Sequence, residues 1–391
     1  MTTTLEERLT AKGPKRILAL DGGGIRGVLT LEYLARIEAL LRKRSPTPDT
    51  FCLADYFDLI GGTSTGSIIA AGLALGFRVS RLQELYGALA NTVFEKPPYR
   101  FGVFVPKFAR LPLVTALKQQ FGDETLGSAR LQTGLMVMTK RLDTGSPWPL
   151  HNNPRGRYYN ERAGGTGIAN KHFPLWQVVR ASTAAPHYFE PERLSVAVKD
   201  SAFVDGAFVD GGVSPFNNPS LQLLLLATLK GYGFEWPAGA DNLLLVSVGT
   251  GSGTTPLTAD AVTGMSALEQ AARSLAALMN DCDGLVQTMM QWLGRSAAPW
   301  TINREIGDLR DDALGGSKWM TYLRYNAVLE PAWLERELGM TVTDVQADAL
   351  RAMDNPSNVA ELARVGAHAA GRQVRDDHFP AVFDRSGAPQ T

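Results

Sequence analysis

The sequence predicts an α/β fold built from layers of helices and strands. Short apolar runs alternate along the chain with segments whose apolar side chains recur every three or four residues, which is the pattern of strands alternating with helices. The runs expected to form strands lie at residues 16–20, 56–60, 135–141, 202–209 and 243–248. Four of these strands run directly into turns that contain glycine. The helical patterns lie at residues 28–44, 67–75, 81–94, 176–184, 219–229 and 266–293.

Composition and charge narrow the class of protein. The chain has 391 residues, with 39 Lys and Arg against 39 Asp and Glu, so its net charge is zero. A neutral chain is not expected to bind nucleic acid through bulk positive charge. The two cysteines, Cys52 and Cys282, are too few for a disulfide framework or a cysteine-rich zinc site, and they favour a reducing compartment.

No segment of the sequence has the pattern of a membrane anchor. There is no run of 18 apolar residues, and residues 1–15 lack the apolar core of a secretion signal. We therefore expect a cytoplasmic protein that has no transmembrane segment and that meets membranes at most peripherally.

A short motif between the second strand and the second helix indicates a nucleophile. Gly62-Thr63-Ser64-Thr65-Gly66 has the Gly-x-Ser-x-Gly pattern of the nucleophile elbow. Glycine flanks the serine because a tight turn from strand to helix leaves no room for other side chains. Ser64 then projects at a helix N-terminus, where developing negative charge is favoured. The alternative is a turn of small residues that has no catalytic role.

Two functions compete for the glycine-rich loop at residues 22–27. Its Gly-x-Gly-x-x-Gly pattern is typical of a dinucleotide phosphate site, but such a site has an acidic residue about 20 positions later, where residues 40–44 are apolar or basic. In the second interpretation the amides of Gly23 and Gly24 form an oxyanion hole, which is favoured beside a nucleophilic serine. Arg26 either meets an anionic head group or is a surface residue at the start of a helix.

A nucleophilic serine needs a base, and an aspartate is the better candidate. None of the five histidines lies in a recognisable catalytic setting, although His187 is the least implausible of them. Asp210 ends an extended run and precedes Gly211-Gly212, where the chain can pass close to another loop. Its pKa must rise by desolvation before it can accept the Ser64 proton. Asp205, in a nearly identical local pattern, is the alternative.

Five motifs in order resemble those of the patatin-like phospholipase family. They lie at residues 21–27, 62–66, 181–186, 210–219 and 247–251, so the resemblance covers about residues 15 to 330. It implies a three-layer α/β/α fold with a mostly parallel central sheet, a variant of the α/β-hydrolase type. It also implies a Ser–Asp dyad without histidine. By motif match, Ser64 is the nucleophile, Asp210 is the base, and Gly22, Gly23 and Gly24 form the oxyanion loop.

The resemblance further implies a serine hydrolase of the phospholipase A type, which cleaves fatty acyl esters of membrane lipids without a metal or another cofactor. We expect a flexible segment at residues 1–14, a patatin-like catalytic domain at 15–330, and a helical extension at 331–391 packed on the same domain. Residues 99–108 mix aromatic side chains with Arg and Lys, which suits either an interfacial segment or a loop packed on the core.

Two other functions remain as alternatives. One is a nucleotide-binding module that uses the loop at residues 22–27, with Ser64 incidental. The other is a phospholipase that a second messenger switches on, as happens in some members of the family. The sequence neither supports nor excludes this regulation.

Overall fold

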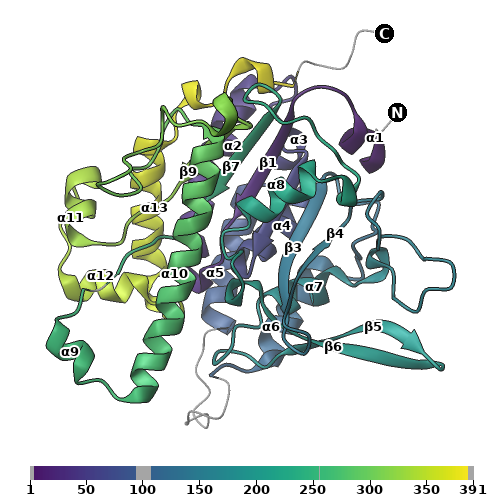
Figure 1. The fold of residues 1–391 in the computed structure, drawn as a ribbon, viewed down its shortest axis with the longest axis horizontal. Coiled ribbons are helices and arrows are strands. Elements are labelled where there is room, and N and C mark those ends of the chain that lie inside the picture. Colours follow the sequence, from purple (N-terminus) through teal and green to yellow (C-terminus); the bar gives the residue numbers. More distant parts are fainter. Residues whose placement is uncertain (1–3, 94–106, 255, 386–391) are drawn as a thin grey trace.

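The computed structural model describes residues 4–93, 107–254 and 256–385, and one mixed sheet lies at its centre (Figure 1). Its strands are β1 (Lys15–Leu20), β2 (Leu59–Thr63), β3 (Gly134–Arg141), β4 (Ser146–His151), β5 (Glu192–Lys199), β6 (Ala202–Asp210), β7 (Leu243–Val248), β8 (Gly294–Arg295) and β9 (Met320–Tyr325). Within the described residues they pair in the order β5-β6-β3-β2-β1-β7-β9-β8, and β4 pairs with β3.

Parallel pairing dominates the middle of the sheet. β1 lies between β2 and β7 and is parallel to both, and β3 and β9 continue the parallel arrangement on either side. β4, β5 and β6 lie on the β3 side and pair in antiparallel fashion. Parallel neighbours require crossover connections, and the helices in these connections cover the faces of the sheet.

Helices cover both faces of the sheet, so the predicted three-layer α/β/α fold with a mostly parallel central sheet is confirmed. Along β1, Leu18 and Leu20 belong to one buried cluster, whereas Ile17 and Ala19 belong to the other. The first cluster packs against α2 (Gly27–Arg44), α4 (Thr65–Ala74), α5 (Val79–Val93), α6 (Arg110–Phe121), α7 (Leu175–Ser182) and α13 (Val359–Gln373). The second packs against α8 (Ser220–Thr228) and α10 (Ala267–Leu293).

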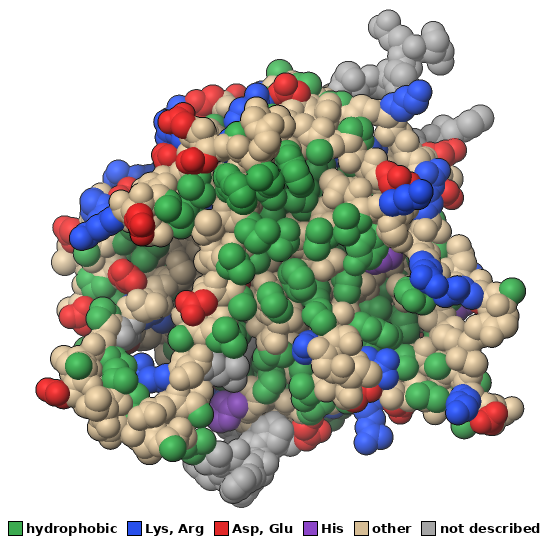
Figure 2. Space-filling model, in the orientation of Figure 1, with side chains coloured by type: hydrophobic (Ala, Val, Ile, Leu, Met, Phe, Trp, Pro, Cys, Tyr) green, Lys and Arg blue, Asp and Glu red, His purple; other side chains and the backbone are tan. Residues whose placement is uncertain are grey.

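The outer side of α10 carries apolar side chains that the core does not cover. Leu278, Leu285 and Trp292 recur every seven residues and are 58%, 59% and 38% exposed. In the orientation of Figure 1, α10 lies in front of the sheet, and the space-filling view of that face shows a broad area of hydrophobic side chains (Figure 2). An area of this kind is typical of an interaction surface.

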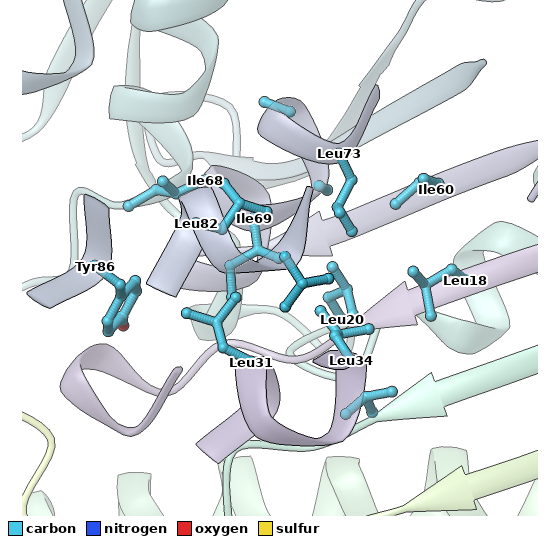
Figure 3. Packing of buried hydrophobic residues seen from close by; sticks show 14 of the residues in the cluster. Leu18, Leu20, Leu31, Leu34, Ile60, Ile68, Ile69, Leu73, Leu82 and Tyr86 are labelled. Atoms are coloured by element: carbon cyan, nitrogen blue, oxygen red, sulfur yellow. The ribbon is translucent and has the colours of Figure 1, made fainter. Parts of the chain in front are cut away.

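The larger core cluster lies beside the C-terminal ends of β1 and β2, which lead into the glycine-rich loop and Ser64. Figure 3 shows Leu31 of α2, Ile69 of α4 and Leu20 of β1 meeting between the helices and the sheet. A small residue in α4 also lets α5 pack closely on it, because a Cβ on Gly72 would lie 2.6 Å from the Leu82 side chain of α5. The helix that follows Ser64 is therefore packed against both the sheet and α5.

Local structure differs from the sequence-based expectations in the second strand and in the antiparallel part of the sheet. The strand expected at residues 56–60 begins at Leu59, because the preceding residues form the short helix α3 (Leu53–Tyr56). β4 and β5 were not predicted. Pro147 and Pro149 make β4 hard to predict from the sequence, although proline is compatible with a strand at the edge of a sheet.

The N-terminal segment is a docked helix over part of its length. Residues 1–14 were expected to form a flexible segment, and within it the structure contains the helix α1 (Leu5–Thr10), which begins with a capping box formed by Thr4 and Glu7. Leu9 is buried, and its carbonyl accepts a hydrogen bond of 2.8 Å from the Trp236 indole. At the other end of the chain, the short helices α11 (Pro331–Trp333) and α12 (Asp344–Arg351) precede α13, which packs along α2.

Asp58 ties both ends of the chain to the sheet. Its Oδ2 accepts hydrogen bonds of 3.0 Å from the backbone amide and from Nη1 of Arg16. Its Oδ1 accepts a hydrogen bond of 2.5 Å from Arg385 and lies 3.6 Å from Nε of Arg8. The Asp58 side chain is only 3% exposed, so three guanidinium groups surround one buried carboxylate.

Replacing Asp58 by alanine leaves this group of arginines without its anion. We expect Asp58→Ala to lower the free energy of unfolding, measured by urea titration, by about 3 to 5 kcal/mol. Asp241→Ala is the matched control, because Asp241 pairs with Arg295 on the exposed surface and such pairs contribute less than about 1 kcal/mol. Equal losses in the two variants would contradict the expectation.

Candidate active site

Ser64 lies at the sharp turn between β2 and α4. Its backbone has φ 53° and ψ −125°, a conformation that L-residues rarely adopt and that typically marks a functional position. The flanking glycines are sterically required. A Cβ on Gly62 would lie 2.1 Å from the Gly66 carbonyl oxygen, and a Cβ on Gly66 would lie 2.3 Å from the Leu20 carbonyl oxygen. The turn therefore has the geometry of the nucleophile elbow.

The register of β6 on β3 brings Asp210 to this turn. Thr63, next to the serine, pairs with Met138 of β3, and the next residue of β3, Thr139, pairs with Asp210. Because β6 runs antiparallel to β3, its last residue lies at the same edge of the sheet as the last residue of β2. Two residues 146 positions apart in the sequence thus become neighbours.

The side chains of Ser64 and Asp210 are hydrogen-bonded. Ser64 Oγ donates to Asp210 Oδ2 at 2.5 Å, and Asp210 Oδ1 accepts a hydrogen bond of 2.7 Å from the Gly212 amide. The two residues are 9% and 5% exposed. Burial raises the pKa of Asp210 to about 6, although the hydrogen bonds from Ser64 and Gly212 favour the carboxylate. A base with this proton affinity suits abstraction of the Ser64 proton at neutral pH.

The glycine-rich loop faces Ser64 with only part of its amides available. Gly22 was expected to contribute to the oxyanion hole, and in this structure its amide already donates to the Asn217 carbonyl at 3.2 Å. Among the described residues, no protein acceptor receives a hydrogen bond from the amides of Gly23 or Gly24. Both glycines line a cavity that also contains Ser64.

A serine that the sequence reasoning did not assign contacts the Ser64 backbone. Ser182 Oγ accepts a hydrogen bond of 2.9 Å from the Ser64 amide and donates one of 2.6 Å to the Met138 carbonyl. Ser182 lies within one of the five sequence motifs, at residues 181–186, so its motif was recognised but its role was not. It links α7 to the turn and to β3.

A second group of side chains, absent from the sequence-based assignment, supports the glycine-rich loop. Arg324 of β9 donates two hydrogen bonds to the Asp21 carboxylate, at 3.0 and 2.6 Å, and a third of 2.8 Å to Ser247 Oγ. Asp283 of α10 accepts hydrogen bonds from Asn217 Nδ2 and from the Asn218 amide, at 2.9 and 3.1 Å. Nothing in the local sequence around Arg324 or Asp283 indicates that they reach the loop.

The competing candidates lie away from Ser64. Asp205 is exposed on β6 and accepts a hydrogen bond from Ser195, and His187 is exposed and does not line the cavity. Arg26 also lies outside the cavity lining. Its guanidinium donates to the Arg351 carbonyl at 3.3 Å, and burial lowers its pKa to about 10. This position does not support a direct contact between Arg26 and a head group.

The cavity beside the dyad is narrow and largely apolar. It has a volume of about 230 Å³, and the residues around Ser64 and Asp210 include Ile68, Leu89, Val93, Leu113, Phe189, Met279 and Met353. The Met353 carbonyl accepts a hydrogen bond of 2.8 Å from the Ile25 amide, so the C-terminal part of the chain forms one wall. Such a lining suits an aliphatic chain better than a polar ligand.

Part of the segment expected to be interfacial, residues 99–106, lies outside the described residues. Phe108, at its end, is buried and stacks on Tyr188 at a centroid distance of 6.2 Å, which agrees with packing on the core. None of the helices in the described part of the chain is both long and apolar enough to cross a bilayer. Those residues likewise contain no group of His, Cys, Asp and Glu side chains arranged to hold a metal ion.

Comparison with known proteins assigns the chain to a family. The model of the patatin-like phospholipases matches residues 18–224, which is more than half of the sequence. The chain belongs to this family. The match begins in β1 and ends in α8, so it includes Ser64 and Asp210 but not Arg324 or Met353.

Named relatives include bacterial, plant and animal proteins. A cGAMP-activated phospholipase of Vibrio cholerae is 30% identical over 250 residues, which are 61% of this chain and 65% of that protein. Patatin group J-1 of Solanum tuberosum is 26% identical over 64% of this chain and 62% of its own length. An intracellular phospholipase A2 of Caenorhabditis elegans is 32% identical over 54% of this chain and 17% of its own length. The chain thus spans less than two thirds of each relative.

The raised pKa of Asp210 predicts a stability cost at neutral pH. Because the folded-state pKa of about 6 exceeds the usual 3.8, the folded protein binds the proton more tightly, and this contribution to stability is lost as the pH rises from about 4 to 6. Asp210→Asn is therefore expected to unfold at a higher temperature than the wild type at pH 7, by an amount equivalent to about 3 kcal/mol. At pH 4 the two melting temperatures should be close, whereas a lower melting temperature of the variant at pH 7 would contradict this account.

Proposed function

We propose that the protein hydrolyses fatty acyl esters of membrane lipids through a Ser64–Asp210 dyad, as a phospholipase A-type serine hydrolase. The observation that supports this most directly is the hydrogen bond of 2.5 Å between Ser64 Oγ and a buried carboxylate whose pKa is raised to about 6. The apolar cavity beside it suits a fatty acyl chain. The names of the patatin and phospholipase relatives agree with this function.

In the acylation step, Asp210 accepts the hydroxyl proton while Ser64 Oγ attacks the ester carbonyl carbon. The carbonyl oxygen becomes an oxyanion, and the free amides of Gly23 and Gly24 are the donors that face it. Collapse of this intermediate breaks the ester bond. The alcohol or lysolipid leaves with the proton from Asp210, and the acyl group remains on Ser64.

In the deacylation step, Asp210 accepts a proton from water, which attacks the acyl carbon. The fatty acid leaves, and the proton returns to Ser64 Oγ. Ser182 contributes by fixing the Ser64 amide and therefore the strained turn, without contact with the substrate. The proposed chemistry needs no metal ion and no cofactor.

We propose that the substrate is presented at a membrane surface. Leu257, Val262 and Leu268 are exposed around α9 (Ala259–Thr263), just before the part of α10 that reaches the cavity through Met279. Exposed apolar side chains on the segment that precedes Met279 favour contact with the bilayer interface. The zero net charge implies that this contact depends on apolar area more than on attraction to anionic lipids.

The alternative of a nucleotide site in the loop at residues 22–27 is disfavoured. A phosphate cradle needs several convergent amides, whereas the Gly22 amide is already bonded to Asn217 and the Ile25 amide to Met353. The loop also faces an apolar cavity, which is a poor environment for a charged phosphate.

The dyad is tested by measuring hydrolysis of a p-nitrophenyl acyl ester and of phospholipid vesicles. We expect Ser64→Ala and Asp210→Asn each to lower kcat by about a thousandfold or more, because each removes a group that acts on the reacting atoms. Asp205→Asn is the matched control on the same strand, and it should retain activity. A fluorophosphonate should modify Ser64 in the wild type, and full activity of Ser64→Ala would refute the proposal.

The pH dependence of the rate follows from the pKa of Asp210. Only the carboxylate can accept the Ser64 proton, so kcat/KM for the p-nitrophenyl ester should rise with pH and level off above a midpoint near 6. The measurement is a pH–rate profile between pH 4 and 8, and the protein is checked at each pH to confirm that it remains folded. A flat profile across pH 5 to 7 would indicate that another group is the base.

A second candidate function adds regulation to the same chemistry. Two relatives, from Vibrio cholerae and Escherichia coli, are named cGAMP-activated phospholipases and are each 30% identical to this chain over about 60% of its length. We propose that hydrolysis by this protein also responds to a nucleotide. The direct comparison is the rate of ester hydrolysis with and without cGAMP.

A further inference from the structure

A second cavity lies beside β9, at the opposite end of the sheet from β5 and β6. It has a volume of about 560 Å³ and is lined by residues of the loop at 297–301, the β9 edge, α11 and the end of α13. It shares no lining residue with the cavity at Ser64. Figure 2 shows a hollow in this part of the molecule, where Figure 1 draws α11 beside α13.

Two tryptophans present parallel rings to this cavity. The indoles of Trp300 and Trp333 have centroids 6.3 Å apart and an interplanar angle of 10°. Trp300 is fixed in place, because its Nε1 donates to the Arg324 carbonyl at 2.9 Å. Both tryptophans are half-buried and line the cavity, so part of their aromatic surface borders it. Indole faces of this kind stack on nucleobases.

The polar part of the lining is basic. Arg336, Arg372 and Arg375 lie around the cavity, against a single carboxylate in the lining, that of Glu337. Arg336 and Arg375 form exposed ion pairs with Glu337 and Asp377, which are weak and exchangeable. Arg372 is exposed, and its guanidinium has no ion pair or hydrogen bond within the described part of the chain. Arginines arranged in this way match phosphate oxygens.

We infer that this cavity is a regulatory nucleotide site, with a base against Trp300 and Trp333 and phosphate on Arg336, Arg372 and Arg375. This inference deepens the regulated form of the proposed function and rests on it. A lipid head group would bind the arginines but would not stack on the parallel indoles. An aliphatic ligand would leave the arginines without a partner and would not need flat aromatic rings. The volume lies in the range of sites for small organic ligands.

Arg324 connects this cavity to the catalytic loop. It belongs to the cavity lining, and its carbonyl accepts the Trp300 hydrogen bond. The guanidinium of the same residue makes the paired hydrogen bonds to Asp21, which immediately precedes Gly22. A ligand that shifts Trp300 or β9 therefore acts on the residue that positions the oxyanion amides, so occupancy changes the rate of hydrolysis.

The first test measures binding alone, by calorimetry on the Ser64→Ala chain, so that no turnover is required. The probes are cGAMP, ATP and inorganic phosphate. We expect at least one nucleotide to bind and phosphate to bind at least tenfold more weakly. Arg372→Glu and Trp333→Leu should each weaken nucleotide binding by at least tenfold. Arg157→Glu, an exposed arginine outside the cavity, is the matched control and should leave binding unchanged.

The second test measures p-nitrophenyl ester hydrolysis by the otherwise wild-type chain with and without the nucleotide that binds. We expect at least a threefold change in kcat, which Arg372→Glu should abolish without altering the rate in the absence of nucleotide. No binding by either nucleotide, or binding that survives both Arg372→Glu and Trp333→Leu, would overturn the site. Binding without a change in rate would overturn its regulatory role. A chain that binds nucleotide but never hydrolyses ester refutes the hydrolase function instead.

Discussion

The antiparallel pairing of β6 with β3 is the constraint on which the site depends. In the purely parallel part of the sheet, each strand delivers its C-terminal end to the same edge, and this is how β1 brings the glycine loop next to Ser64. The proposed base, Asp210, comes from β6, which runs antiparallel to β3 and places Asp210 opposite Thr139. A slip of one residue would turn the Asp210 side chain to the other face of the sheet and remove the proposed proton acceptor.

Buried polar groups hold this edge of the sheet in one arrangement. Ser64 is hydrogen-bonded to both Asp210 and Ser182. Asn217 is hydrogen-bonded to both Gly22 and Asp283. Asp21 is paired with Arg324. Each of these groups is costly to bury alone and is stabilised only by its partners. The strained backbone at Ser64 is therefore maintained by contacts from several separate segments.

Sequence reasoning recovered the parts of this arrangement that are local. Strand and helix positions follow from apolar periodicity, and the glycines at 62 and 66 follow from the space available in one turn. The partners Ser182, Asp283 and Arg324 could not be inferred, because each is brought to the loop by the packing of a distant element. Gly22 was assigned with its neighbours because a pattern of glycines does not reveal which amides are already bonded. The α1 helix was missed because its six residues bury little besides Leu9.

Met353 forms part of the cavity wall at Ser64, and this affects when the cavity can form during synthesis of the chain. Its carbonyl accepts a hydrogen bond from the Ile25 amide within the glycine-rich loop, yet it is more than 300 positions away from that loop in the sequence. A chain still emerging from the ribosome contains Ser64 and Asp210 long before it contains this closing segment. We therefore expect the cavity at Ser64 to form late, once the segment around Met353 is free to fold.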